Sequence, residues 1–256
     1  MDRLQVAWIY FGKVQPKGRD RLLNKQPKNS NNPINVMEMD DDKLLSFDYW
    51  KLEDVERIFN ISVDKASDAL QSWLAADAPI SVDERTQLNL LRERLVENVQ
   101  DWNEAALKFY FFGPLMSLIW FKNEQYSSFL ENKLTIEVED QVVQGNIDFM
   151  VATGRQTPRT PFYTLHEYKP EPGYTSYPLG QLLIAMVAAQ KRNEAAGLDL
   201  PPYGAYVMGR FFFFVYFYKN RYAQSLAYDA TQEDIFDIYA IIKKMKDYIE
   251  VSLEQI

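Results

Sequence analysis

Hydrophobic residues recur at helical spacing in the first half of the chain. Ser81 is followed three residues later by Glu84, and apolar positions then recur at intervals of three or four residues: Leu88, Leu91, Leu95, Val99, Trp102, Ala106 and Phe109. Because Ser and Glu at this spacing form a capping box, the pattern predicts one long amphipathic helix that ends or kinks at Gly113-Pro114. Apolar positions over residues 51–79 predict short helices before it.

The hydrophobic period changes to two from Leu134 onward. Leu134, Ile136 and Val138 alternate with polar residues, and a turn at Asp140-Gln141 leads into the run VVQGNIDFMVA, which predicts a hairpin. A third strand, FYTLHEYK, follows; next come a helix over about residues 177–193 that is apolar on all sides, two or three strands, and a final helix. This order predicts an α/β fold, a mixed sheet with helices on its faces.

Composition limits the domain organisation and the partners. The chain has 256 residues, 47% of them hydrophobic, which suffices for a large core. The net charge of 28 − 36 = −8 argues against a protein that coats nucleic acid by bulk charge, although residues 1–28 carry seven Lys or Arg against two Asp. That basic stretch fits either a phosphate-contacting loop or a solvated tail. We expect two regions: residues 1–80, a basic loop and helical extension, and residues 81–256, the core.

Two absences exclude much chemistry. The chain has no Cys, and His166 is its only histidine, so disulfides, thiol nucleophiles, thiolate zinc sites and paired-imidazole sites are ruled out. Carboxylates, lysine, tyrosine, serine and a metal with oxygen ligands remain. The sequence shows neither an apolar run of about 20 residues nor a signal-peptide pattern, so we expect a cytoplasmic protein without a membrane partner.

The candidate chemistry lies on two of the predicted strands. Side chains alternate along a strand, so Glu167 and Lys169 share one face of FYTLHEYK, and Asp148 lies on the preceding strand. Two carboxylates from neighbouring strands can hold one Mg²⁺, and a lysine beside them can position the attacking water. These groups are suited to phosphodiester hydrolysis. His166 falls on the opposite face, which predicts a buried core histidine.

The text GNIDFMV, followed eighteen residues after Asp148 by HEYK, resembles the G-x-x-D…E-x-K signature of the PD-(D/E)XK phosphodiesterase superfamily. The run from about Trp102 to Asp247 also looks like uncharacterised bacterial members of that superfamily. The resemblance implies a restriction-endonuclease-like core, a central mixed sheet flanked by helices with a helical N-terminal extension. It also implies a Mg²⁺-dependent nuclease, with Mn²⁺ as a substitute and DNA as the expected nucleic acid.

The resemblance assigns further roles residue by residue. The main-chain carbonyl of Tyr168 would join Asp148 and Glu167 as a metal ligand, Glu104 would assist the metal shell, and Gln181 would orient the site. Glu104 equally fits the solvated polar face of its helix. Arg155 and Arg159, in the loop before the third strand, fit either phosphate contacts or ordinary surface arginines.

A non-hydrolytic module that keeps this fold and binds nucleic acid or protein is the alternative function. The excess of acidic over basic residues favours the alternative. The presence of all three signature residues, Asp148, Glu167 and Lys169, favours the nuclease. A homodimer or a partner protein would fit either function.

Overall fold

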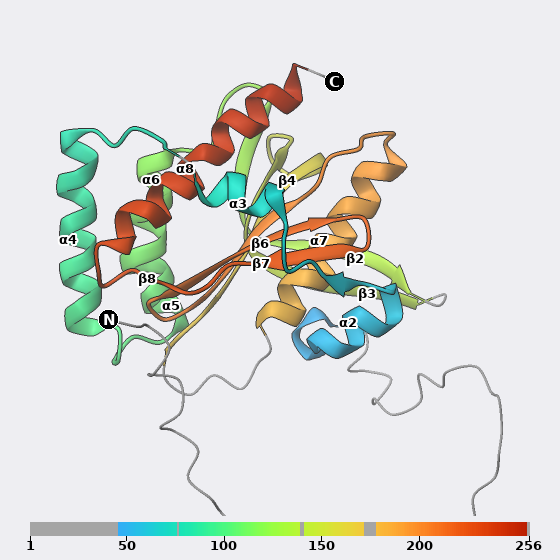
Figure 1. Ribbon diagram of the computed structural model, residues 1–256, viewed down its shortest axis with the longest axis horizontal. Coiled ribbons are helices and arrows are strands. Elements are labelled where there is room, and N and C mark those ends of the chain that lie inside the picture. The colour runs from blue at the N-terminus through green and yellow to red at the C-terminus, as the bar shows by residue number, and fades with distance from the viewer. Residues whose placement is uncertain (1–45, 76, 139–140, 172–177, 255–256) are drawn as a thin grey trace, which may run out of the picture. The chain divides into compact units, whose positions relative to one another are not determined.

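The computed structural model describes residues 46–75, 77–138, 141–171 and 178–254 (Figure 1). Within them, one mixed sheet contains β1 (Ser62–Val63), β2 (Tyr126–Val138), β3 (Gln141–Thr153), β4 (Arg159–Lys169), β5 (Tyr203–Met208), β6 (Phe211–Tyr218), β7 (Arg221–Gln224) and β8 (Tyr228–Asp229). The strand order is β1-β7-β6-β5-β4-β3-β2, with β8 on β6. The pairs β4·β5 and β1·β7 are parallel and the others are antiparallel. The predicted α/β fold with a mixed sheet is confirmed.

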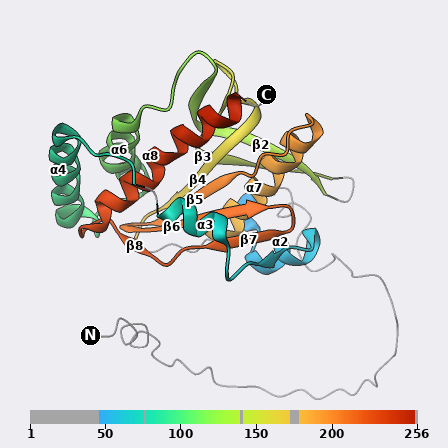
Figure 2. The same cartoon turned by 45° about the horizontal axis from the view of Figure 1, so that its top comes forward.

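The helical elements are the 3₁₀-helix η1 (Phe47–Tyr49), α2 (Leu52–Phe59), α3 (Asp68–Leu74), α4 (Val82–Asn98), α5 (Glu104–Leu107), the π-helix η2 (Lys108–Phe112), α6 (Gly113–Ile119), α7 (Pro178–Ala195) and α8 (Asp234–Leu253). Figures 1 and 2 show α4, α6 and α8 on one side of the sheet and α7 with α2 on the other. Alternation along β5 explains this division. Ala205 and Val207 join the core that includes α8, whereas a Cβ at Gly204 would overlap Met186 of α7.

The predicted long helix is wrong in its extent. Its capping box is present, since the Ser81 hydroxyl accepts from Glu84 N and the Glu84 carboxylate accepts from Ser81 N. The helix ends at Asn98, however, and a new one begins at Glu104, because the Asn103 side chain accepts from the backbone N–H of Ala106 and caps it. Glu104 therefore lies at the start of a helix rather than in the middle of one.

The expected break at Gly113-Pro114 is also absent. Helical structure continues from α5 through the π-helix η2 into α6, and Gly113 N donates to Lys108 O five residues back. Pro114, which has no N–H to donate to the preceding turn, comes directly after this π-helical hydrogen bond. The wider π-turn thus carries the chain past a proline without a break.

Residues 46–75 belong to the same compact unit as the rest of the described chain. Strand β1 pairs with β7, and Trp73 Nε1 of α3 donates to Ile241 O of α8 at 2.9 Å. Two close approaches fix η1: a Cβ at Gly145 would overlap the Phe47 side chain, and a Cβ at Gly180 would overlap the carbonyl of Trp50. The 46–50 segment is thereby fixed against β3 and the start of α7.

Some predictions concern residues outside this description. The whole basic N-terminal stretch, residues 1–28, and the turn residue Asp140 lie outside the described residues. A domain boundary at residue 80 stays a prediction. Among the described helices, none combines the length and apolar character needed to cross a membrane.

Candidate active site

Asp148 lies where β3 and β4 separate. The two strands pair from Thr153↔Arg159 to Phe149↔His166, and there the pairing ends. Beyond it, Asp148 Oδ2 accepts the main-chain N–H of Tyr168 at 2.6 Å, so a carboxylate occupies the place of the next backbone partner. The sheet therefore opens at this point, with the buried Asp148 side chain in the gap.

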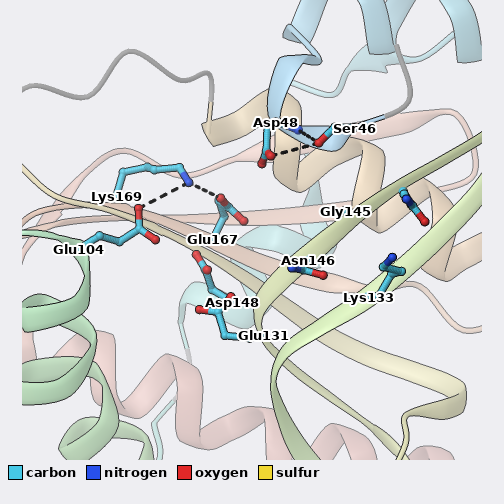
Figure 3. A pocket seen from close by; sticks show the side chains of 11 residues that line it. Ser46, Asp48, Glu104, Glu131, Lys133, Gly145, Asn146, Asp148, Glu167 and Lys169 are labelled. Carbon is cyan, nitrogen blue, oxygen red and sulfur yellow. Dashed lines mark hydrogen bonds and ion pairs between the residues drawn. The ribbon is translucent and has the colours of Figure 1, made fainter. Parts of the chain in front are cut away.

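Glu167 and Lys169 lie beside this gap on one face of β4, as the alternation predicted (Figure 3). Lys169 Nζ is 2.7 Å from Glu167 Oε1, and the two side chains are only 14% and 8% exposed. The structure brings Asp148, Glu167 and Lys169 together in one cavity.

Tyr168 contacts β3 through its backbone and η2 through its ring. The N–H and C=O of one strand residue point to the same side, so the Tyr168 carbonyl faces the gap that holds Asp148. The ring stacks on Phe112 with centroids 3.9 Å apart, and its hydroxyl lies 3.0 Å from Nδ1 of His166. These contacts fix the end of β4.

Lys108 is a central site residue that the sequence analysis did not select. Its Nζ lies 2.6 Å from Asp148 Oδ1, 2.7 Å from Glu104 Oε1 and 2.8 Å from Glu131 Oε1. Glu104, which is 40% exposed, also lies 3.9 Å from Lys169 Nζ through its other oxygen. The spacing of four between Glu104 and Lys108 was the available signal, because such residues meet on a helix.

Burial determines the protonation of the carboxylates. It raises the pKa of Glu167 to about 8, and the charge of Asp148 acts in the same direction while Lys169 opposes it. Burial likewise raises the pKa of Asp148, against the attraction of Lys108. Burial works to lower the pKa of Lys108, but Asp148 and the three hydrogen bonds outweigh it and raise the pKa. Burial therefore outweighs the attraction of the two ammonium groups at both carboxylates.

The cavity has a volume of about 520 Å³. Its lining residues are Ser46, Asp48, Glu104, Glu131, Lys133, Gln144, Gly145, Asn146, Asp148, Glu167 and Lys169. Gln181 does not line it: its Nε2 donates to Asp48 Oδ1 at 2.9 Å, and its Oε1 is buried without a hydrogen-bond partner. Gln181 therefore acts on the cavity through Asp48. No local sequence pattern indicates Asp48, because the position of η1 depends on tertiary packing.

The oxygen donors suit a hard divalent cation. Asp148, Glu167 and the Tyr168 carbonyl surround the gap, with Glu104 at its rim, and Mg²⁺ prefers such ligands. In the described part of the chain, no group of three His, Cys, Asp or Glu residues is placed to hold a metal ion. The carboxylates are instead paired with the two ammonium groups, since Lys108 bonds three of them and Lys169 bonds a fourth.

Three other predicted residues lie away from the carboxylates. Arg155 and Arg159 are exposed near the opposite end of the β3–β4 ladder, about 17 Å along the strands from Asp148 at roughly 3.4 Å per residue. His166 is 1% exposed, and burial lowers its pKa to about 3, so it is neutral at physiological pH. Its prediction as a core histidine is confirmed.

Comparisons with the models of known protein families and with curated proteins give no match for this chain.

Proposed function

We propose that this protein is a Mg²⁺-dependent nuclease with a restriction-endonuclease-like core, and that it hydrolyses phosphodiester bonds of nucleic acid, foremost DNA. One observation carries the proposal: two buried carboxylates, Asp148 and Glu167, meet where β3 and β4 separate, with Lys169 at 2.7 Å from Glu167. Buried charge is unfavourable without a compensating role, and metal binding would supply one. The signature that resembles the PD-(D/E)XK superfamily consists of these same residues.

The roles follow from the positions of the side chains. Asp148, Glu167 and the Tyr168 carbonyl would hold the metal, with Glu104 assisting from the rim. When bound, Mg²⁺ would polarise a phosphoryl oxygen and lower the pKa of a water molecule. Lys169, with three N–H donors on a partly buried ammonium, would hold the attacking water and neutralise charge that develops on the phosphate. Gln181 positions Asp48 through its amide.

The test is calorimetric titration of Mg²⁺ and Mn²⁺ into the full chain, beside Asp148→Asn and Glu167→Gln. Cleavage of plasmid and oligonucleotide is measured on the same preparations. We expect both metal binding and cleavage to disappear in the variants. Asp83→Asn, the same carboxylate-to-amide change at an exposed residue that does not line the cavity, is the control and should retain both activities. Unchanged metal affinity in the two carboxylate variants would refute the proposal.

The second candidate is a non-hydrolytic module that binds nucleic acid or protein. The position of Lys108 favours it, because an ammonium already bonds Asp148, Glu104 and Glu131. Salt dependence identifies the ligand class: affinity for nucleic acid falls by roughly one log unit per log unit of salt for each phosphate neutralised. This module would bind its ligand without metal and leave phosphodiester bonds intact.

A further inference from the structure

A second cavity, of about 750 Å³, adjoins the cavity that contains Asp148, Glu167 and Lys169. The two cavities share Asp148 and Glu131, and the second also includes Lys108. The rest of its lining comes mainly from α5, η2 and α6 and is largely apolar, including Phe109, Phe112, Met116, Trp120, Phe121 and Leu130. We call it the aromatic pocket. Its volume and its apolar walls beside a few charged groups are typical of a small-ligand site.

Two aromatic side chains of this pocket are exposed to solvent. Phe109 is 73% exposed and Trp120 is 62% exposed. Leu130 of β2, which also lines the pocket, is 66% exposed. Large apolar side chains grouped around a cavity mark a binding surface more often than isolated ones do. The inner wall differs, because Phe112 is buried and stacks on Tyr168. The pocket thus has a fixed aromatic wall and an open aromatic rim.

The backbone at both rim residues is unusual. Trp120 ends α6 with φ 55° and ψ 75°, a left-handed conformation that Gly or Asn normally adopts at a helix end. For a bulky residue this conformation is unfavourable, because Cβ comes too close to the following carbonyl oxygen. Phe109 lies in the π-helix η2, a helical form frequent at functional sites. The fold therefore retains an unfavourable backbone conformation at a residue that presents an exposed indole to the pocket.

We propose that the aromatic pocket binds an unpaired nucleobase, next to the phosphodiester held at Asp148 and Glu167, by stacking on Phe109 and Trp120. The inference rests on the proposed nuclease function and specifies its substrate as single-stranded or unpaired nucleic acid. Stacking on an aromatic side chain is largely independent of base identity and adds affinity that does not depend on the net charge of the protein, which is −8. The shared residue Asp148 places the base site directly beside the phosphate site.

The test separates base stacking from phosphate binding. Labelled oligothymidylate and an abasic oligonucleotide of the same length are titrated with the full chain in EDTA, and binding is followed by fluorescence anisotropy. We expect oligothymidylate to bind more tightly than the abasic strand. Phe109→Ala and Trp120→Ala should each weaken oligothymidylate binding about 5- to 100-fold and leave abasic binding unchanged. Trp120→Phe should retain most of the affinity, because it keeps an aromatic face.

Leu226→Ala is the matched control, since Leu226 is 89% exposed and lines neither cavity. Thermal denaturation of every variant detects a loss of folding. Equal affinity for the two oligonucleotides, absence of binding, or equal weakening of both by the alanine variants would overturn the inference. If base-dependent binding is absent but metal-dependent plasmid cleavage persists, the pocket assignment is refuted and the proposed nuclease function is retained. Base-dependent binding without metal binding would retain the pocket and refute the nuclease.

Discussion

At the scale of single residues, Lys108 is the group most directly tied to the carboxylates. It neutralises Asp148, Glu104 and Glu131 at 2.6–2.8 Å, where a divalent cation would compete with it. We therefore expect Lys108→Met to bind Mn²⁺ more tightly than the unchanged protein. Without metal, the variant should lose about 1–3 kcal/mol of unfolding free energy, below the 3–5 typical of broken buried pairs because Lys108 is 23% exposed.

Calorimetry and urea denaturation measure the two effects of Lys108→Met. Lys133→Met is the control, because Lys133 lines the same cavity from an exposed position on β2. It should change neither the metal affinity nor the unfolding free energy appreciably. Weaker or unchanged Mn²⁺ binding in Lys108→Met would show that the ammonium does not compete with the metal.

The proposed metal binding should depend on pH through Glu167. Burial raises its pKa to about 8, and a carboxyl group must lose its proton to bind a cation. The apparent Mn²⁺ affinity should therefore rise up to tenfold per pH unit toward pH 8 and level off above it. At pH 7 a proton should be released on binding, and titrations in buffers of different ionisation enthalpy measure it. The Glu167→Gln variant has no carboxyl proton at residue 167 to release on Mn²⁺ binding. A binding enthalpy of the unchanged protein that is the same in all buffers would contradict the prediction.

Strand periodicity predicted only part of the site. Alternation placed Glu167 and Lys169 on one face correctly, because a period of two is a local property of any strand. Lys108 and Asp48 reach the carboxylates from η2 and η1, and their positions depend on tertiary packing. Glu104 was placed in the wrong part of a helix because the cap at Asn103 was not recognised.

At the scale of elements, the capping box of α4 also anchors the last helix. Glu84 accepts hydrogen bonds from Ser81 N at 2.7 Å, Tyr239 Oη at 2.5 Å and Lys243 Nζ at 2.7 Å. Burial works to raise its pKa, but Lys243, Tyr239 and Ser81 outweigh this and lower the pKa to about 2. One carboxylate thus connects the start of α4 to the middle of α8.

We expect Glu84→Gln to lower the unfolding free energy at pH 7 by about 1–2 kcal/mol. The folded pKa of Glu84 lies below the ordinary value of 4.5, so its stabilisation is complete above pH 4.5 and disappears as the pH falls through 2. The difference between the two proteins should shrink over that range in urea denaturation. Asp83→Asn, an equal change of charge at an exposed position in the same turn, should have little effect. An equal loss in both variants would exclude the hydrogen bonds as the cause.

At the scale of the whole molecule, the order of elements predicted the α/β fold, because hydrophobic periods distinguish strands from helices locally. The pairing of the strands was harder to predict from the sequence. β1 has only two residues, Ser62 and Val63, both exposed, and it joins β7 more than 150 residues away. The division of the helices between the two faces depends on close approaches such as that of Gly204 to Met186. These contacts involve residues distant in sequence, which periodicity does not report.

Two buried groups of β4, Glu167 and His166, contribute in opposite directions to the pH dependence of stability. Glu167 has a folded pKa of about 8 against an ordinary 4.5, so the folded state binds the extra proton between these values, and stability falls as the pH rises through this window. His166 has a folded pKa of about 3 against 6.5, so the unfolded state binds the extra proton there, and stability rises with pH up to 6.5. The two effects oppose each other between pH 4.5 and 6.5, whereas Glu167 acts without His166 above that range.

In the metal-free protein, the contributions of Glu167 and His166 to the unfolding free energy should therefore nearly cancel between about pH 4.5 and 6.5. From pH 6.5 to 8 the protein should lose up to about 1.4 kcal/mol per pH unit, the slope of a single proton. Urea denaturation across this range measures the profile. Glu167→Gln removes the titrating carboxyl and keeps its shape, so its profile should rise from pH 4.5 to 6.5 through His166 and then stay flat. A rise in stability of the unchanged protein from pH 6.5 to 8 would contradict the assignment, because it would require the unfolded state to bind the extra proton.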